Sequence, residues 1–328
     1  MTTGLNVPVA LIVFNRPSHT VTVFQAIASV RPKMLFVIAD GPRAGHPTDT
    51  VKCQQVRQIV GHVTWPCEVR TDFADENMGC RRRIVSGTDW VLSQVNEAIF
   101  LEDDTLPHHT FFRFCEEMLI RYRDDRRVMS ICGCNLFPHR DPQSSYFFST
   151  LANPWGRAIW RRSWECLDRD MRAWPEVRDQ GLLTNIFSHR GHRRYWEAVM
   201  EHTSRGGFDT WDYQFMLSCW LQNGLNVVPG KNLVRNIGFG SDSTHTRVNP
   251  GSGWLALQNF DFPLRHPTAV MPDRGFDNRV CNELIRERSI LRRSKYKAKH
   301  LADKLGEFIL LGMHKRAERG WLRQLTRQ

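Results

Sequence analysis

Short apolar runs recur in the first part of the chain, and each is long enough for one buried strand. The runs at 9–14, 34–39 and 98–101 are apolar throughout, which is typical of strands buried on both faces of a sheet. A further strand is predicted near 67–71. Helices are predicted between these strands, over 17–29, 48–60 and 80–95, with Thr48 or Asp49 as the cap of the second.

Strands and helices that alternate at this spacing indicate βαβ units. We therefore predict an α/β fold class, with a Rossmann-like, mainly parallel sheet flanked by helices. At 328 residues the chain is long enough for one large α/β domain or two small ones.

Each of the four predicted strands ends in, or leads into, polar residues. These are Arg16, Asp40, Asn77-Met78-Gly79 and Glu102-Asp103-Asp104. Carboxyl ends of parallel strands meet at one edge of a sheet, where ligands bind, so we expect these residues to lie near one another. Taken singly, each has an ordinary explanation as turn chemistry or a solvated side chain. Four such signals on one edge favour a binding site.

Three adjacent carboxylates at the end of a strand repel one another unless a cation neutralises them. Hard oxygen ligands suit Mg²⁺ or Mn²⁺, which proteins often bind with one or two carboxylates plus substrate phosphates. The triplet therefore predicts a divalent-metal site that holds a nucleoside diphosphate, with a solvated acidic turn as the alternative. The sequence has no Gly-x-Gly-x-x-Gly after the first strand and no Gly-Lys-Ser/Thr loop, which argues against dinucleotide cofactors and P-loop chemistry.

A tryptophan-rich stretch at 155–164 follows a predicted helix over 108–123 and a strand over 128–131. Trp160 and Trp164 are predicted to lie on one helix face as core residues. Trp155, beside a glycine in a loop, is either a binding residue for a sugar ring or part of the core.

Further candidates lie beyond residue 175. The Arg- and His-rich stretch at 175–207 is either a basic patch or a solvated helix face. Asp209 or Thr210 is expected to cap the next helix, and Asp212 in its first turn faces either solvent or a cleft. Residues 226–229 and 233–234 lead to the loop 238–246. His245, in a small polar loop, is either a diphosphate or metal contact or an exposed side chain without a role.

The net charge of +11 is concentrated at the C-terminal end. Between Arg286 and Gln328 there are 13 Lys and Arg against 4 Asp and Glu, so this segment carries +9. The remainder is nearly neutral, and we therefore predict no nucleic-acid partner. We predict a main domain over 1–275 and a basic amphipathic helical tail over 276–328. Apolar residues at helical spacing lie in this tail at Leu301, Leu305, Phe308 and Ile309. Such a tail suits an anionic membrane surface, or it packs back onto the domain.

Nine cysteines without a framework spacing are expected to be reduced thiols. The start of the sequence lacks a basic segment followed by an apolar one, and no run approaches the length of a membrane-spanning helix. We therefore expect a cytoplasmic protein, peripheral on the inner membrane face if its tail binds lipid.

Four short segments together resemble a known family. They are 12–16 (Ile-Val-Phe-Asn-Arg), 38–40 (Ile-Ala-Asp), 101–104 (Leu-Glu-Asp-Asp), which a Phe-rich helix follows, and 211–212 (Trp-Asp). Over residues 9–246 the chain resembles the metal-dependent GT-A glycosyltransferases, nearest to the N-acetylglucosaminyltransferase I type and its bacterial family-2-like relatives. The Glu-Asp-Asp triplet departs from the commoner Asp-x-Asp.

The resemblance implies roles for particular residues. Arg16 and Asp40 would hold the nucleotide base and ribose, and Asp103 would contact the ribose. Glu102 would contact the transferred sugar and Asp104 would coordinate the metal. Asp212 would be the catalytic base, and His245 would lie in a loop over the diphosphate. The remaining candidates for donor binding are Asn77, Gly79 and Trp155.

The resulting hypothesis is a metal-dependent, inverting glycosyltransferase of the hexosyl type. It would use Mn²⁺ or Mg²⁺ to move a sugar from a nucleotide-diphosphate sugar to a hydroxyl of a glycan, a lipid-linked glycan or a surface polysaccharide. One alternative is a sugar nucleotidyltransferase, which would usually show a Gly-rich loop with Arg and Lys after the first strand. The other is a non-catalytic sugar- or membrane-binding module, which would not need both the carboxylates and Asp212.

Overall fold

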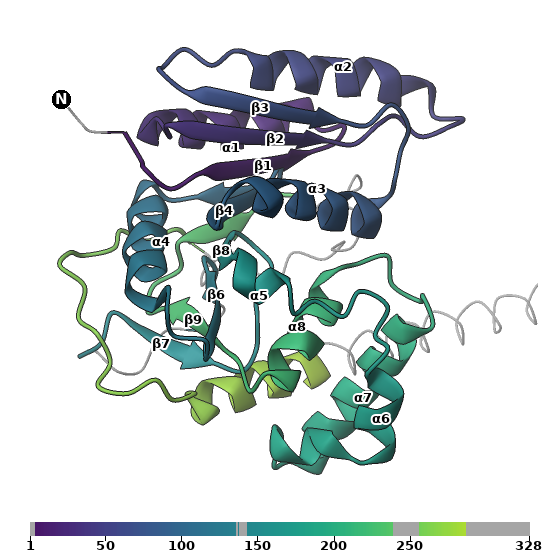
Figure 1. Cartoon of the computed structure of the whole chain (residues 1–328), viewed down its shortest axis with the longest axis vertical. Helices are drawn as coiled ribbons and strands as arrows, with labels where there is room; N and C mark the ends of the chain where they lie inside the picture. The colour runs from purple at the N-terminus through teal and green to yellow at the C-terminus, as the bar shows by residue number, and fades with distance from the viewer. Residues whose placement is uncertain (1–3, 136, 138–142, 239–255, 287–328) are drawn as a thin grey trace, which may run out of the picture. The chain divides into compact units, whose positions relative to one another are not determined.

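The computed structural model describes residues 4–135, 137, 143–238 and 256–286 (Figure 1). The chain divides into two compact units, Met1–Asp277 and Asn278–Gln328, and the elements below belong to the first. His245 and the tail residues Leu301, Leu305, Phe308 and Ile309 lie outside the described residues. The predicted division after residue 275 and the nature of the tail therefore stay predictions.

Eight strands of the described chain form one sheet, in the order β3-β2-β1-β4-β8-β6-β9-β7. Their bounds are β1 Val9–Val13, β2 Met34–Ala39, β3 Glu68–Phe73, β4 Glu97–Glu102, β6 Val128–Cys132, β7 Tyr146–Ser149, β8 Arg157–Trp160 and β9 Leu225–Pro229. β3, β2, β1 and β4 are mutually parallel, as are β6 and β9, whereas β8 and β7 run against their neighbours. The predicted α/β class with a mainly parallel sheet is confirmed.

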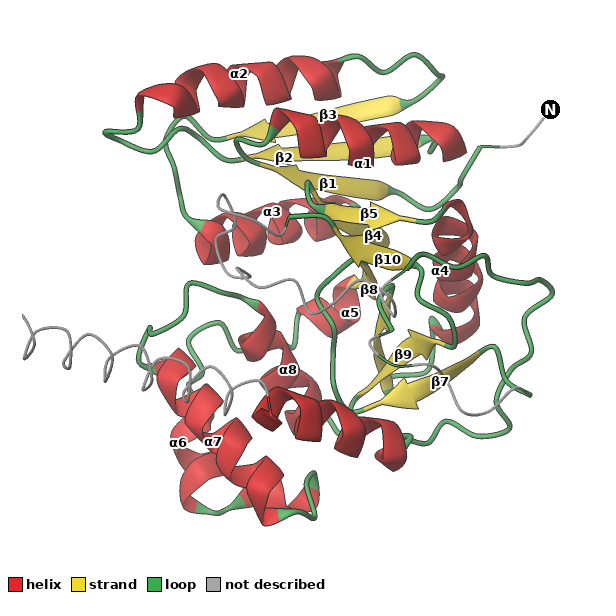
Figure 2. Ribbon diagram, turned by 180° about the vertical axis from the view of Figure 1, so that it is seen from behind, coloured by secondary structure: helices red, strands yellow, loops and turns green. Residues whose placement is uncertain are grey.

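Helices cover both faces of this sheet. α1 (Pro17–Val30), α2 (Pro47–Gly61) and α4 (His109–Tyr122) contribute to the core on one face. α3 (Cys80–Gln94), α5 (Arg161–Trp164) and α8 (Asp212–Leu221) contribute to the core on the other. Figure 1 shows α3 on the near side of the sheet, and the reversed view in Figure 2 brings α1 to the front.

Other elements complete the first unit. β5 (Thr105–Pro107) and β10 (Val234–Asn236) form a separate antiparallel pair. α6 (Trp174–Asp179), a 3₁₀ turn (Leu182–Asn185) and α7 (Arg190–Ser204) lie between α5 and α8 in the sequence.

The two cores explain the continuous apolar runs of the central strands. In β1, Val9, Leu11 and Val13 join the core under α1, whereas Ala10 and Ile12 join the core under α3. Because successive side chains of a strand point to opposite faces, a strand covered by helices on both faces has no polar positions.

In the tryptophan-rich stretch, the predicted burial of two tryptophans is confirmed but their predicted secondary structure is not. Trp160 and Trp164 are both buried, as predicted for core residues. Their placement on one helix face was wrong, because Trp160 is the last residue of β8, where it pairs with Glu97 of β4, and α5 begins at Arg161. Strand pairing with a distant segment therefore overrides the local helical spacing.

The start of α2 also differs from the prediction. The helix begins at Pro47 with His46 as the N-cap residue, so neither Thr48 nor Asp49 caps it. Asp49 instead accepts hydrogen bonds from the guanidinium of Arg43, at 2.6 and 3.1 Å, and from the amide of Asn15 at 2.8 Å.

The nine cysteines are free thiols, as predicted, and most of them are buried. Over the part of the chain that the structure describes, no helix is both long and apolar enough to cross a membrane.

Candidate functional site

The strand order places the ends of β1 and β4 side by side. β2 and β3 lie on one side of β1, and β4 lies on the other, paired in register so that Ile12 is opposite Glu102. The order of strands therefore reverses between β1 and β4. In α/β sheets, ligands bind at the carboxyl ends of the strands at such a reversal, and Glu102-Asp103-Asp104 follows β4 at this point.

Strand alternation separates the first two carboxylates of the triplet. Glu102 continues the side of β4 that packs under α3, and its Oε1 lies 3.8 Å from Nη1 of Arg157. Asp103 continues the side that packs under α1. Its Oδ1 lies 3.7 Å from Nη1 of Arg16, and its Oδ2 accepts a hydrogen bond from the backbone N–H of Phe14 at 3.3 Å. Glu102 and Asp103 thus contact different arginines.

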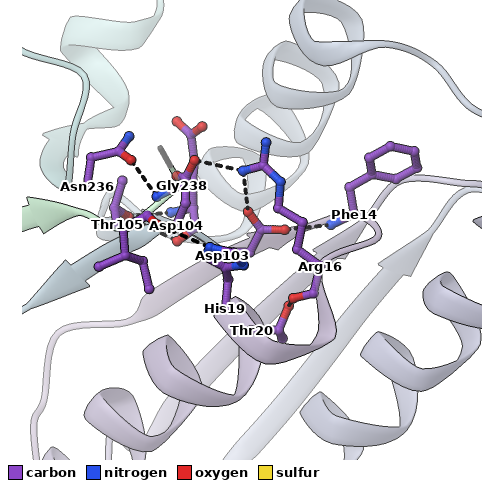
Figure 3. A network of polar contacts seen from close by, with 11 residues as sticks. Phe14, Arg16, His19, Thr20, Asp103, Asp104, Thr105, Asn236 and Gly238 are labelled. Carbon is purple, nitrogen blue, oxygen red and sulfur yellow. Dashed lines mark hydrogen bonds and ion pairs between the residues drawn. The ribbon is translucent and has the colours of Figure 1, made fainter. Parts of the chain in front are cut away.

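Asp104 lies in the turn between β4 and β5, where Arg16 reaches it (Figure 3). Nη1 of Arg16 donates to Oδ2 of Asp104 at 2.8 Å. The backbone carbonyl of Asp104 accepts from the N–H of Ile237, which follows β10. A Cβ at Gly238 would lie 2.3 Å from Oδ2 of Asp104 and 2.8 Å from its Cβ. A residue without a side chain is therefore needed beside this carboxylate.

The carboxylates carry more negative charge than the two arginines offset. Burial and the charge of Asp104 raise the pKa of Glu102 to about 8, although Arg157 acts in the opposite direction. The same two causes raise the pKa of Asp103 to about 7, although Arg16 and the N–H of Phe14 oppose them. A further cation at this position would relieve the remaining repulsion.

The residues present fit a divalent cation. Their ligands are carboxylate oxygens, the donors that Mg²⁺ and Mn²⁺ prefer, and their repulsion is incompletely neutralised. Among the described residues, no group of three or more His, Cys, Asp or Glu side chains is placed to hold a metal. The described protein would therefore supply one or two carboxylate ligands, with Asp104 as the first.

The exit of β2 is tied to the loop that follows β3. Oδ1 of the buried Asp40 accepts the backbone N–H groups of Gly41 and Met78 at 2.9 and 2.8 Å. Its Oδ2 accepts from the side-chain amide of Asn77 at 2.9 Å. Burial raises the pKa of Asp40, and these hydrogen bonds act against that rise. The structure thus brings two predicted site residues, Asp40 and Asn77, into direct contact.

Gly79, the third predicted residue of this loop, is the N-cap residue of α3 and has a φ of 80°. The first N–H groups of the helix, from Cys80 and Arg81, donate to Oδ2 and Oδ1 of Asp209 at 3.0 and 3.1 Å. The prediction that Asp209 or Thr210 caps α8 was therefore wrong. Asp209 caps α3 instead, and a contact across 128 residues leaves no local signal in the sequence.

Asp212 is the first residue of α8, as predicted, and lies near Glu102. Its negative charge contributes to the raised pKa of Glu102 and opposes the effect of burial on the pKa of Arg157. The hydroxyl of Thr210 donates to Oδ1 of Asp212. The indole ring of Trp211 has the guanidinium of Arg157 over its face, 3.8 Å from the ring centroid.

Trp155 is partly buried and packs against the core under α1. This position is compatible with both predicted roles, a core residue and a binding residue for a sugar ring. Three further residues of the site, Arg157, Asp209 and Gly238, were not predicted as site residues from the sequence. Arg157 is a charged residue in the otherwise apolar β8, and that contrast was the available signal. Nothing local marks the other two, because their partners lie elsewhere in the chain.

No protein-family model matches the chain, and a search of curated protein sequences gives no match. Among solved structures, it is similar to a mannosyltransferase from Pyrobaculum calidifontis in complex with GDP-Man and Mn²⁺, at 12% identity and a TM-score of 0.35, over 68% of this chain and 70% of that one. It is also similar to residues 1–349 of S. aureus TarS in complex with UDP-GlcNAc, at 11% identity and a TM-score of 0.39, over 70% of this chain and 57% of that one.

A third similar structure is a UDP-glucose pyrophosphorylase complexed with UDP-glucose. The identity is 8% and the TM-score 0.35, over 68% of this chain and 90% of that one.

Proposed function

We propose that this chain is a metal-dependent, inverting glycosyltransferase with the GT-A type of site. It moves a sugar, of the hexosyl class, from a nucleoside diphosphate donor to a hydroxyl acceptor. The observation that carries the proposal is the position of Glu102, Asp103 and Asp104 at the strand reversal, with Arg157 between Glu102 and Trp211, the residue before Asp212. The narrower likeness to the N-acetylglucosaminyltransferase I type rests on the sequence segments alone.

Donor binding is assigned to the ends of β1, β2 and β4. Asp103 and Arg16 would contact the ribose and base, and Asn77 and Gly79 would line the same edge. Both carboxylate oxygens of Asp40 accept hydrogen bonds from residues 41, 77 and 78. Asp40 would therefore support donor binding by fixing the loop that carries Asn77, and not by contacting the nucleotide itself.

Asp104, with Asp103 beside it, would hold the divalent cation. When bound, this cation would stabilise the negative charge that develops on the diphosphate leaving group. Arg16 contacts Asp104 at 2.8 Å, so a residue assigned to the nucleotide lies directly beside the assigned metal ligand.

Asp212 would be the general base. The acceptor oxygen forms a bond to the anomeric carbon as its proton passes to the carboxylate of Asp212, and the bond from that carbon to the diphosphate breaks, with the electron pair leaving on the diphosphate oxygen. One displacement of this kind inverts the sugar carbon. Asp212 lies near Glu102, the residue assigned to the transferred sugar, and this proximity supports the assignment.

A sugar nucleotidyltransferase is the second candidate. Only Phe14, Asn15 and Arg16 separate β1 from α1, which begins directly at Pro17. This connection is too short for a Gly-rich loop around a triphosphate, which favours glycosyl transfer. Both enzyme classes occur among the similar structures, and the low TM-scores give neither a preference.

The test is incubation of the protein with Mn²⁺ and a panel of nucleotide sugars, with and without sugar and lipid-linked acceptors. A glycosyltransferase transfers the sugar to an acceptor or, slowly, to water. Both reactions release the nucleoside diphosphate. A nucleotidyltransferase supplied with labelled pyrophosphate instead cleaves the nucleotide sugar to the sugar 1-phosphate and a labelled nucleoside triphosphate. Formation of labelled nucleoside triphosphate without release of nucleoside diphosphate would overturn the proposal in favour of the second class. If both reactions are absent across the panel, the result favours a binding module.

A further inference from the structure

The loop 77–81 is held from two sides by two carboxylates that are far apart in the sequence. On one side, Asp40 accepts from Asn77 and Met78. On the other, Asp209 accepts the backbone N–H groups of Cys80 and Arg81. Asp40 is buried beneath the loop, whereas Asp209 is exposed at its surface. The loop that carries the donor-binding candidates is thus fixed to the segment that precedes α8.

Gly79 makes the second contact close. A Cβ at this position would lie 3.1 Å from Oδ2 of Asp209, and the φ of 80° is one that residues with side chains rarely adopt. The carboxylate of Asp209 therefore lies directly against the first turn of α3. Hydrogen bonds from a helix N-terminus to an ionised carboxylate are among the stronger contacts of this kind.

The same segment holds Asp212. Thr210, next to Asp209, donates its hydroxyl to Oδ1 of Asp212. Trp211 lies under the guanidinium of Arg157, whose Nη1 is 3.8 Å from Glu102. Three successive residues thus contact α3, the carboxylate of Asp212 and the arginine beside Glu102.

We propose that Asp209 is a positioning residue that couples the loop 77–81 to Asp212. By tying the start of α3 to the segment 209–212, it sets where the carboxylate of Asp212 lies relative to a donor on that loop. This inference rests on the proposed function, in which Asp212 is the base. Asp209 would act through its contacts with the backbone of residues 80 and 81, and its removal is expected to impair transfer more than donor binding.

The test compares Asp209→Ala and Asp209→Asn with a matched control, Asp273→Ala. Asp273 also accepts a backbone N–H at the start of a helix, from Phe276 at 2.9 Å, so its loss removes the same kind of contact at another helix start. Asp209→Ala is expected to lower kcat of transfer by about 10- to 100-fold, as for a small misplacement of a reacting group. The KM for donor should change by less than about threefold. Asp209→Asn should recover only part of the rate, because its single amide oxygen can accept one of the two N–H groups.

Amide hydrogen exchange provides a second measurement that does not depend on activity. Asp209→Ala should increase exchange in 77–81 and in 210–214 together, and Asp273→Ala should change neither segment. Faster exchange in 77–81 alone, with unchanged kcat, would reduce Asp209 to a helix cap and overturn the coupling. Absence of transfer by the unsubstituted protein would instead overturn the proposed function, and the exchange measurement would still decide whether the two segments are coupled.

Discussion

Glu102 and Asp103 meet different arginines, because Glu102 ends β4 and Asp103 begins the turn with its side chain on the opposite side. Glu102 points to the side of Arg157 and Asp103 to the side of Arg16. Asp104, in the turn, shares Arg16. The sequence argument held that three adjacent carboxylates require a cation, and two arginines supply part of that charge. Burial, and after it the charge of Asp104, raises the pKa of Glu102 and Asp103, and the two arginines do not fully offset these effects.

Replacing Asp212 by asparagine tests its role as the base. The variant keeps the size of the side chain but cannot accept a proton, so transfer should fall by about 10²- to 10⁴-fold. Donor binding, measured by titration calorimetry, should remain near that of the unsubstituted protein. Asp179→Asn, an exposed carboxylate on α6, is the matched control and should leave both quantities unchanged. Near-normal transfer by Asp212→Asn with intact donor binding would refute the assignment.

Gly238→Ala tests the close approach of Gly238 to Asp104. The added methyl would lie 2.3 Å from Oδ2 and 2.8 Å from Cβ of Asp104, so the carboxylate or the backbone must shift. Overpacking of this kind should lower the free energy of unfolding by about 1–3 kcal/mol.

Gly191 in α7 provides the control, because a Cβ there meets nothing within 4 Å. Gly191→Ala should raise the free energy of unfolding by about 0.4–1 kcal/mol, because alanine restricts the unfolded chain at a position where its side chain meets no obstacle. Urea denaturation of both variants measures the two opposite changes. An unchanged stability of Gly238→Ala would show that the site tolerates a side chain beside Asp104.

At the scale of elements, Asp49 links the start of α2 to the connection between β1 and α1. The hydrogen bonds from Arg43 and Asn15 lower the pKa of Asp49 below its usual value, although burial acts in the opposite direction. A carboxyl whose pKa is lowered in the folded state stabilises the fold at pH values above its pKa in the unfolded chain, near 3.8. This contribution is lost as the pH falls toward the pKa of the folded state.

Asp49→Asn should therefore lower the free energy of unfolding at pH 7 by about 1–2 kcal/mol, given that Arg43 is partly exposed. The difference from the unsubstituted protein should shrink as the pH is lowered from 5 toward the acid limit. Chemical denaturation at a series of pH values measures it. A difference that stays constant with pH would mean that the ion pair contributes nothing to stability.

The central strands could be predicted because their burial on both faces is written into consecutive residues. β1, β2 and β4 agree with the predicted runs to within one or two residues. β8 could not be recognised, because its four residues are extended only through pairing with β4 and β6, which lie far away in the sequence. Short strands of this kind depend on partners and carry little local pattern.

The site divides in the same way. The polar residues at the strand ends were recognisable because each follows an apolar run, and topology gathers them at one edge. Asp209 resembled a local helix cap in the sequence, yet it caps α3 across the fold. Arg157 contacts Glu102 and Trp211 only because β8 lies next to β4. Contacts between distant segments were beyond any local rule.

At the scale of the whole molecule, the positive charge and the proposed site lie in different parts of the sequence. The segment from 286 to 328 carries +9 of the net +11. We propose that this segment binds an anionic membrane surface, which would suit an enzyme with a lipid-linked acceptor. Co-sedimentation with vesicles that contain anionic lipid should be lost on deletion of residues 286–328 and should weaken with added salt. Binding that is unchanged by the deletion would contradict this proposal.

The central claim is that the carboxylates after β4 form a metal–diphosphate site. Thermal unfolding with Mn²⁺ and a nucleoside diphosphate, each alone and both together, tests this claim most directly. The two ligands together should raise Tm by more than the sum of their separate effects, and Asp104→Asn should abolish that excess, while Asp179→Asn retains it. An equal excess in Asp104→Asn, or none in the unsubstituted protein with any nucleoside diphosphate, would contradict the account.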